Sequence, residues 1–253
     1  MTDEQAQDYL AFYGYESVQD FQHAAGLTPD DDLGPITQRA MQAPRCGVTA
    51  EMERAAAGTG ARDPGRDYSE DPIIYQHVGW LRQLDQETQR AEFQAAFNSW
   101  AAVCGVQGRE ALPGERAELD IDVRTRRQDR NLDGPGRTLA YAIVGGGLIV
   151  FDGDETWRPT GSRQPGILFR NVAAHELGHT LNFYHSRVAS ALLAPTYNPA
   201  VAGPVSPDDV ERGLRAYGRP APVDTPTTPP PPGGDHFTGQ LVYLEGKLHR
   251  VVE

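Results

Sequence analysis

Three histidines and a glutamate in the run HELGHTLNFYH (175–185) have the types and spacing of a metal site. Residues four apart lie on one face of a helix, so His175 and His179 can direct two imidazole nitrogens at one zinc ion about 2.0 to 2.1 Å away. Glu176 lies beside them. Its carboxylate is the expected general base, which takes a proton from water and passes it to a leaving amine.

The third histidine requires a sharp turn, because a further ligand from the same helix would fall on the wrong face. Asn182 stands where that turn is needed, and Asn tolerates left-handed backbone geometry better than any residue except Gly. With His185 added, three ligands leave one tetrahedral position open, which distinguishes a catalytic zinc from a structural one. Three unrelated histidines on an amphipathic helix are the alternative, and the spacing of His185 disfavours it.

Composition excludes several classes of function. The 253-residue chain carries 35 acidic and 23 basic residues, a formal net charge of −12, which disfavours a nucleic-acid partner because phosphate binding needs clustered Lys and Arg. No run approaches the roughly 18 apolar residues that span a bilayer, and the start MTDEQAQDYL lacks the basic and apolar regions of a signal peptide. Cys46 and Cys104 are too few for a disulfide framework.

Local signals divide the chain into segments. Caps at Thr2 and Ser17, a stop at Gly26 and a first-turn proline at Pro35 predict three short helices near the N-terminus. The next stretch is rich in Ala, Gly and Arg without apolar periodicity, which indicates an exposed connector that is easily cut. The predicted segments are 1–48 (helical unit), 49–67 (connector), 68–219 (main domain), 220–235 (proline-rich linker) and 236–253 (a tail that can form one hairpin around residues 245 and 246).

The main domain mixes strands with helices. Strands are predicted at IIYQHV (73–78), ELDIDV (118–123) and GLIVF (147–151). A first helix carries core aromatics at helical spacing, a second helix covers 167–181, and a third is bounded by the cap Ser206, Pro207 and the stop Gly218.

The segment PRCGV (44–48) resembles the cysteine switch of the matrix metalloproteinase (matrixin) family, and the likeness runs from residue 9 to 220. It implies an α+β fold, in which a twisted, five-stranded mixed sheet and three helices follow a three-helix prodomain. In that family the propeptide thiolate fills the open zinc position, and the resemblance implies this role for Cys46. It also implies that Arg45 pairs with a carboxylate. Cys104 matches no functional position and is expected to be structural.

Two further segments resemble the two halves of the family's calcium loop, DGPGRTLAYA (133–142) and FDGDETW (151–157). Calcium takes six to eight oxygen ligands. The implied ligands are the carboxylates of Asp133, Asp152 and Glu155 and the backbone carbonyls of Gly134, Gly136 and Thr138. An ordinary acidic turn is the alternative.

The chain departs from the family at a second, structural zinc. The family's histidines there correspond to Arg126, Tyr141 and Val150, none of which replaces an imidazole, so one zinc is expected. In SRVASALLAPTY (186–197), which resembles the family's Met-turn beneath the metal, Leu193 stands at the methionine. Leu and Met are close in volume, so the expected role is hydrophobic support.

The resemblance also implies a substrate cleft. An extended peptide is expected to pair with the edge strand near Leu139 and Ala140. Pro195 and Tyr197 match the wall of the pocket that accepts the side chain after the cut bond.

Together these features predict a latent zinc-dependent endopeptidase with one zinc and with calcium, held inactive by Cys46 until the propeptide is removed. The implied partners are protein or peptide substrates and an activating protease, and the implied location is extracellular or the cell envelope. Two alternatives stay open, an inactive zinc-binding relative and a peptidoglycan-binding wall protein, because the three-helix unit also resembles small peptidoglycan-binding modules. Contact with a cell wall or matrix through the terminal segments is open as well.

Overall fold

The first two N-terminal helices of the computed structural model begin at the predicted caps Thr2 and Ser17, and the third begins at the predicted proline, Pro35. They are α1 (Asp3–Tyr13), α2 (Val18–Ala24) and α3 (Pro35–Met41). The hydroxyl of Thr2 accepts a hydrogen bond from the Gln5 N–H, and the Ser17 hydroxyl accepts one from Asp20. These helices share a small core formed by Ala6, Leu10, Val18, Phe21 and Met41.

A six-stranded sheet of order β1-β5-β6-β4-β2-β3 lies at the centre of the main domain. Its strands are β1 (Arg45–Cys46), β2 (Ile73–His77), β3 (Gly108–Glu110), β4 (Leu119–Arg124), β5 (Thr138–Ala142) and β6 (Leu148–Asp152). Neighbours pair in parallel except β5 with β6. The predicted five-stranded mixed sheet is therefore confirmed, and β1 extends it from the N-terminal segment. β3 has no sequence signal of its own.

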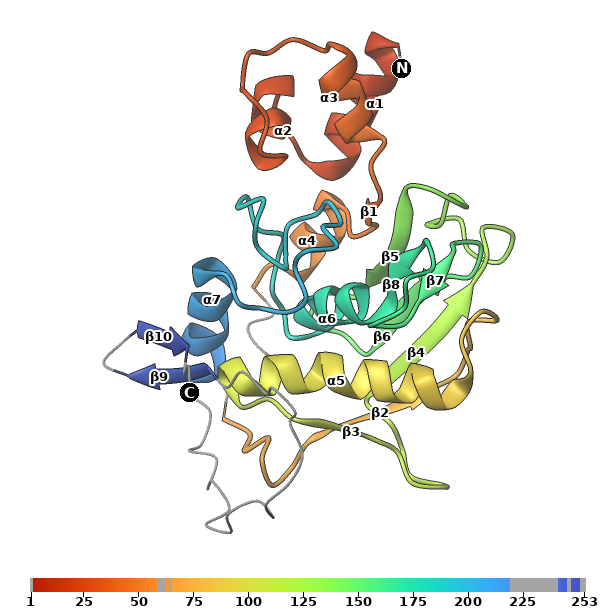
Figure 1. The fold of residues 1–253 in the computed structure, drawn as a ribbon, viewed down its shortest axis with the longest axis vertical. Coiled ribbons are helices and arrows are strands. Elements are labelled where there is room, and N and C mark those ends of the chain that lie inside the picture. Colours follow the sequence, from red (N-terminus) through yellow and green to blue (C-terminus); the bar gives the residue numbers. More distant parts are fainter. Residues whose placement is uncertain (1, 59–61, 64, 219–240, 245–246, 251–253) are drawn as a thin grey trace. The chain divides into compact units, whose positions relative to one another are not determined.

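The described part of the main domain contains three helices: α5 (Gln86–Cys104) and α6 (Phe169–Thr180), which contact the sheet, and α7 (Pro207–Tyr217), which packs against α5. The two short strands β7 (Trp157–Arg158) and β8 (Ile167–Leu168) pair just before α6. α5 and α6 pack side by side (Figure 1) and bury the aromatic face of α5, including Trp100, in the main core. α7 begins after its Ser206 cap and ends before Gly218, as predicted.

The segment expected to be an exposed connector is partly structured. Its first half forms α4 (Ala50–Ala56), capped by the Thr49 hydroxyl, which accepts the Met52 N–H at 3.2 Å. Val48, Met52 and Ala56 follow one another at intervals of four and pack into a cluster that also contains Cys46. The stripe is too short, and Ala too small, for apolar periodicity to reveal it.

The second half of the same segment is anchored to the main domain. The Arg66 guanidinium forms hydrogen bonds of 2.8 and 2.9 Å with the carboxylate of Glu118. Residues 57 and 58, which directly follow α4, are exposed.

The structure describes residues 2–58, 62–63, 65–218, 241–244 and 247–250, in two units, Met1–Ala221 and Pro222–Glu253. In the second unit β9 (Leu241–Leu244) pairs antiparallel with β10 (Lys247–Arg250). The predicted turn at 245 and 246 and the predicted linker 220–235 lie outside the described residues. None of the described helices is long and apolar enough to cross a membrane.

Candidate metal centre

Helix α6 carries His175 and His179 one turn apart and is buried along almost its whole length. Its close packing depends on Gly178. A Cβ atom there would lie 2.6 Å from Leu193 Cδ2 and 2.9 Å from Trp100 Cζ2. Leu193, which is fully buried, thus packs directly against the helix between the two histidines.

The turn after α6 is left-handed at Asn182, whose φ is 67°. The Asn182 N–H donates to the His179 carbonyl at 2.8 Å, and the Phe183 N–H donates to the Gly178 carbonyl at 3.1 Å. These two bonds satisfy carbonyl groups at the end of α6. They turn the chain so that His185 returns toward the helix.

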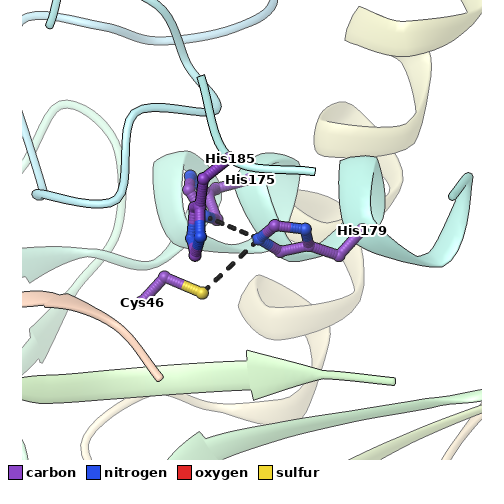
Figure 2. Close-up of side chains that lie close together, drawn as sticks. All are labelled: Cys46, His175, His179 and His185. Carbon is purple, nitrogen blue, oxygen red and sulfur yellow. Dashed lines mark hydrogen bonds between the residues drawn. The ribbon is translucent and has the colours of Figure 1, made fainter. Parts of the chain in front are cut away.

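Four side chains converge on one point from three segments of the chain (Figure 2): Cys46, His175, His179 and His185. The Nδ1 atom of His175 lies 2.6 Å from the Leu192 carbonyl oxygen, and that of His179 lies 2.7 Å from the Phe183 carbonyl oxygen. Because a carbonyl only accepts, both Nδ1 atoms carry the ring proton. In the neutral rings, the two Nε2 atoms therefore present lone pairs to each other.

The spacing of these atoms fits a zinc ion. The Nε2 atoms of His175 and His179 are 3.1 Å apart, and Cys46 Sγ is 3.5 Å from His179 Nε2. A tetrahedron with metal–nitrogen bonds of 2.0–2.1 Å has edges of about 3.3 Å. His185 Nε2 is buried without a hydrogen-bond partner among the described residues, as expected for an atom kept for a metal.

Burial keeps the three rings neutral, as metal ligation requires. It lowers the pKa of His175 to about 4. For His179 and His185, burial and the neighbouring rings lower the pKa well below its ordinary value. Glu176 is fully buried beside them. Burial raises the pKa of its carboxyl to about 8, and the nearby Cys46 thiol partly offsets that rise.

Asp209 positions the segment under the site, a role that the sequence reasoning missed. Its carboxylate, fully buried at the start of α7, accepts the N–H groups of Leu192 at 2.7 Å and Leu193 at 3.2 Å. Leu192 in turn supplies the carbonyl that orients His175. The Ser206 cap places Asp209 in the first turn of α7, but no local pattern indicates which N–H groups its carboxylate accepts.

The N-terminal segment fills the expected substrate cleft. β1 runs parallel to β5, and the Gly47 N–H donates to the Ala140 carbonyl at 2.7 Å. On its other side the Cys46 N–H donates to the Pro195 carbonyl at 2.9 Å. Leu139, Pro195 and Tyr197 line one small cavity together with Cys46, His175 and Glu176. The residues expected to bind substrate thus contact or surround residues 44–48, the switch segment.

Arg45 corrects one expectation, since among the described residues it has no carboxylate partner. Its side chain is 2% exposed. The guanidinium carbon lies 3.3 Å from the centre of the Tyr13 ring and 5.1 Å from that of Tyr9, and Nη1 donates to the Tyr9 hydroxyl. Aromatic faces and a hydroxyl therefore replace the carboxylate, and they tie β1 to α1.

A family model described as Matrixin matches residues 67–218. The chain belongs to the matrixin family. Human matrix metalloproteinase-19 is 30% identical over 258 residues, covering 89% of this chain and 49% of that protein. Human matrilysin is 31% identical, with 85% of each chain covered, and the hatching enzyme of Paracentrotus lividus is 32% identical, covering 84% of this chain and 35% of the relative. The chain thus spans about half the length of the first of these relatives.

The expected calcium ligands of this matrixin come together in one loop region. In three pairs a carboxylate accepts a backbone N–H: Asp152 from Gly134, Glu155 from Gly136, and Asp133 from Thr138. Asp152 and Glu155 are buried, and burial together with the neighbouring carboxylates raises the pKa of both side chains. This is an environment that a bound cation would stabilise.

The positions of the family's second zinc hold other interactions in this matrixin. The Tyr141 hydroxyl donates to Asp129 at 2.6 Å, and the same carboxylate oxygen accepts from Arg124 at 3.0 Å. Val150 is fully buried in the cluster with Cys46. Arg126 lies in the exposed part of this loop, where its backbone N–H donates to Asp154.

Proposed function

We propose that this matrixin is a latent zinc-dependent endopeptidase that Cys46 holds inactive until its propeptide is removed. The observation that carries the proposal is the convergence of the Cys46 thiol with His175, His179 and His185, all four ligand atoms lying within 4.8 Å of one another. Three ligands come from the main domain and the fourth from the segment that fills the cleft. Only one of a thiolate and a water molecule can occupy that fourth position.

Each group has a distinct task in catalysis. Zinc held by the three histidines would polarise the scissile carbonyl and lower the pKa of a water in the fourth position. The edge of β5 near Leu139 and Ala140 pairs with the extended peptide once β1 has left. The Glu176 carboxylate accepts the proton of the attacking water and returns it to the leaving amine. Pro195 and Tyr197 form the wall that receives the next substrate side chain.

Calcium is part of the proposal as a structural ion. Asp133, Asp152 and Glu155, with the carbonyl oxygens of their loop, supply the hard oxygen ligands that calcium prefers. We propose a single zinc per chain, because hydrogen bonds of Tyr141 and the packing of Val150 replace ligands of the second zinc.

The substrates we propose are proteins or peptides in extended conformation, cleaved outside the cell or in its envelope after an activating protease has cut the connector. Two other classes of function were open from the sequence. A wall-binding role for residues 1–48 does not require Cys46 among the histidines, and an inactive relative does not require Glu176 beside them. The presence of Cys46 and Glu176 therefore favours a latent enzyme over both alternatives.

The test compares the intact chain with the chain cut in the connector, using a fluorogenic peptide. The cut form should cleave the peptide and lose activity with a zinc chelator, whereas the intact chain should be nearly inactive. Cys46→Ala should release activity without a cut, and Cys104→Ala should not. Glu176→Ala should retain zinc but lose turnover by about 10²- to 10⁴-fold. Undiminished turnover in that variant would refute the mechanism.

A further inference from the structure

Glu53, in helix α4, contacts the third histidine of the zinc site. Its Oε1 atom lies 3.1 Å from Nδ1 of His185 and also accepts the backbone N–H of His185 at 2.7 Å. The two side chains are 24% and 14% exposed, so water competes little for either group. One carboxylate oxygen thus holds both the ring and the backbone of His185.

The other two histidines have partners that belong to the main domain. Leu192 and Phe183 offer carbonyl oxygens to the Nδ1 atoms of His175 and His179. Those carbonyls stay in place when the propeptide leaves. Glu53 precedes the exposed residues 57 and 58, so a cut after α4 removes it together with Cys46.

Helix α4 is packed so that Glu53 stays at this position. Met52 and Ala56 enter the cluster that contains Cys46, and Tyr184, the residue before His185, packs against the same cluster. At the start of the helix, Gly14 abuts Ala50 so closely that a Cβ atom on Gly14 would lie 2.4 Å from the Ala50 Cβ. α4 is therefore held on two sides.

We propose that Glu53 is a positioning residue for His185 and a second element of latency. The inference rests on the proposed function. The propeptide contacts the centre twice, with the Cys46 thiol at the open position and with the Glu53 carboxylate behind His185. Partners of this kind fix the tautomer and orientation of a ligating histidine and make it more basic, and their loss typically costs about 10- to 100-fold in metal affinity. The intact chain should therefore hold zinc more firmly than the processed one.

The two contacts should also support each other. Glu53 and Cys46 lie on one packed segment, so loss of the Glu53 contact frees α4 and lowers the effective concentration of the thiol at the site. Removing the Glu53 carboxylate should consequently expose Cys46 as well as loosen zinc.

The experiment uses the zinc-loaded, intact chain and compares Glu53→Ala with Glu51→Ala. Both glutamates lie in the first turn of α4, so each variant loses one acidic residue at the helix start, but Glu51 is exposed. Zinc transfer to a chromogenic chelator and alkylation of Cys46 by iodoacetamide are followed in parallel. In Glu53→Ala zinc transfer should be about 10- to 100-fold faster, with faster alkylation, while Glu51→Ala should match the unaltered chain.

Glu53→Gln gives a second, milder variant, because its amide oxygen still accepts both N–H groups without the charge. Charge-assisted hydrogen bonds are roughly twice as strong as neutral ones, so zinc transfer should be about 3- to 10-fold faster than in the unaltered chain. Equal rates for Glu53→Ala and Glu51→Ala overturn the proposal. If Glu53→Ala does not fold, equal rates for Glu53→Gln and the unaltered chain overturn it instead. Neither readout needs peptide cleavage. An inactive processed chain would therefore refute the proposed enzymatic function without refuting the role of Glu53.

Discussion

Gly47→Ala tests how the switch segment is held, because Gly47 directly follows β1 and packs closely against β5. A Cβ atom there would lie 2.6 Å from Thr138 Cγ2 and 3.2 Å from the Ala140 carbonyl oxygen that Gly47 itself bonds. The Thr138 methyl group can move only partly, since Thr138 is 4% exposed. Overpacking of this kind costs about 1–3 kcal/mol, and here the cost falls only on the latent state.

A cost of about 2 kcal/mol corresponds to about 30-fold in the equilibrium between closed and open chain. Alkylation of Cys46 and residual peptide cleavage by the intact variant should both rise by about that factor. After the propeptide is removed, variant and unaltered enzyme should be identical, because residue 47 is gone. Gly65→Ala is the matched control, since its Cβ would meet only Asp63 Oδ1 at 3.6 Å. An intact Gly47→Ala chain as latent as the control would refute the reasoning.

Three further predictions concern stability. Tyr13→Ala should destabilise the intact chain by about 2 kcal/mol, measured by urea unfolding, because Arg45 loses an aromatic face; Tyr13→Phe should cost little. Burial lowers the pKa of His77 from 6.5 to about 4. The neutral ring therefore makes its full contribution to the free energy of unfolding above pH 6.5, and this contribution is lost as the pH falls toward 4. The loss reaches about 3 kcal/mol and should be absent in His77→Phe. Calcium should raise the melting temperature, and Asp152→Ala should reduce that rise.

Each of these has an outcome that contradicts it. Equal stability of the Ala and Phe variants at residue 13 would remove the cation–π account of Arg45. His77 stacks on Trp80 with ring centres 4.5 Å apart, a contact that Phe preserves, so parallel pH curves for the two proteins would exclude His77 as the titrating group. A calcium response that is unchanged in Asp152→Ala would place the ion elsewhere.

Local sequence signals predicted most of the fold. The ends of α7 follow from Ser206 and Gly218, and the turn that brings back His185 follows from Asn182, because caps and left-handed turns depend on a few adjacent residues. The mixed sheet and the three main helices followed from periodicity and from the resemblance to matrixins. Helix α4 was missed because its apolar stripe is only two turns long.

Local sequence signals could not predict contacts between segments that are far apart in the chain. Nothing near Arg45 indicates that its partners are tyrosines of α1, and nothing near Asp209 indicates that it holds Leu192. The pairing of β1 with β5 likewise joins residues that are far apart in the chain, and no local pattern encodes which edge a two-residue strand will meet. These contacts determine how the site is held, whereas the ligands themselves were visible in the sequence.

Zinc K-edge X-ray absorption on the intact, zinc-loaded chain tests the central claim most directly, because it counts the sulfur atoms bound to the metal. The cysteine-switch account predicts one sulfur at about 2.3 Å with three nitrogen ligands at about 2.0–2.1 Å. The sulfur should vanish in Cys46→Ala and persist in Cys104→Ala. A spectrum of the intact chain with nitrogen and oxygen ligands only, or a sulfur ligand that survives in Cys46→Ala, would contradict the account.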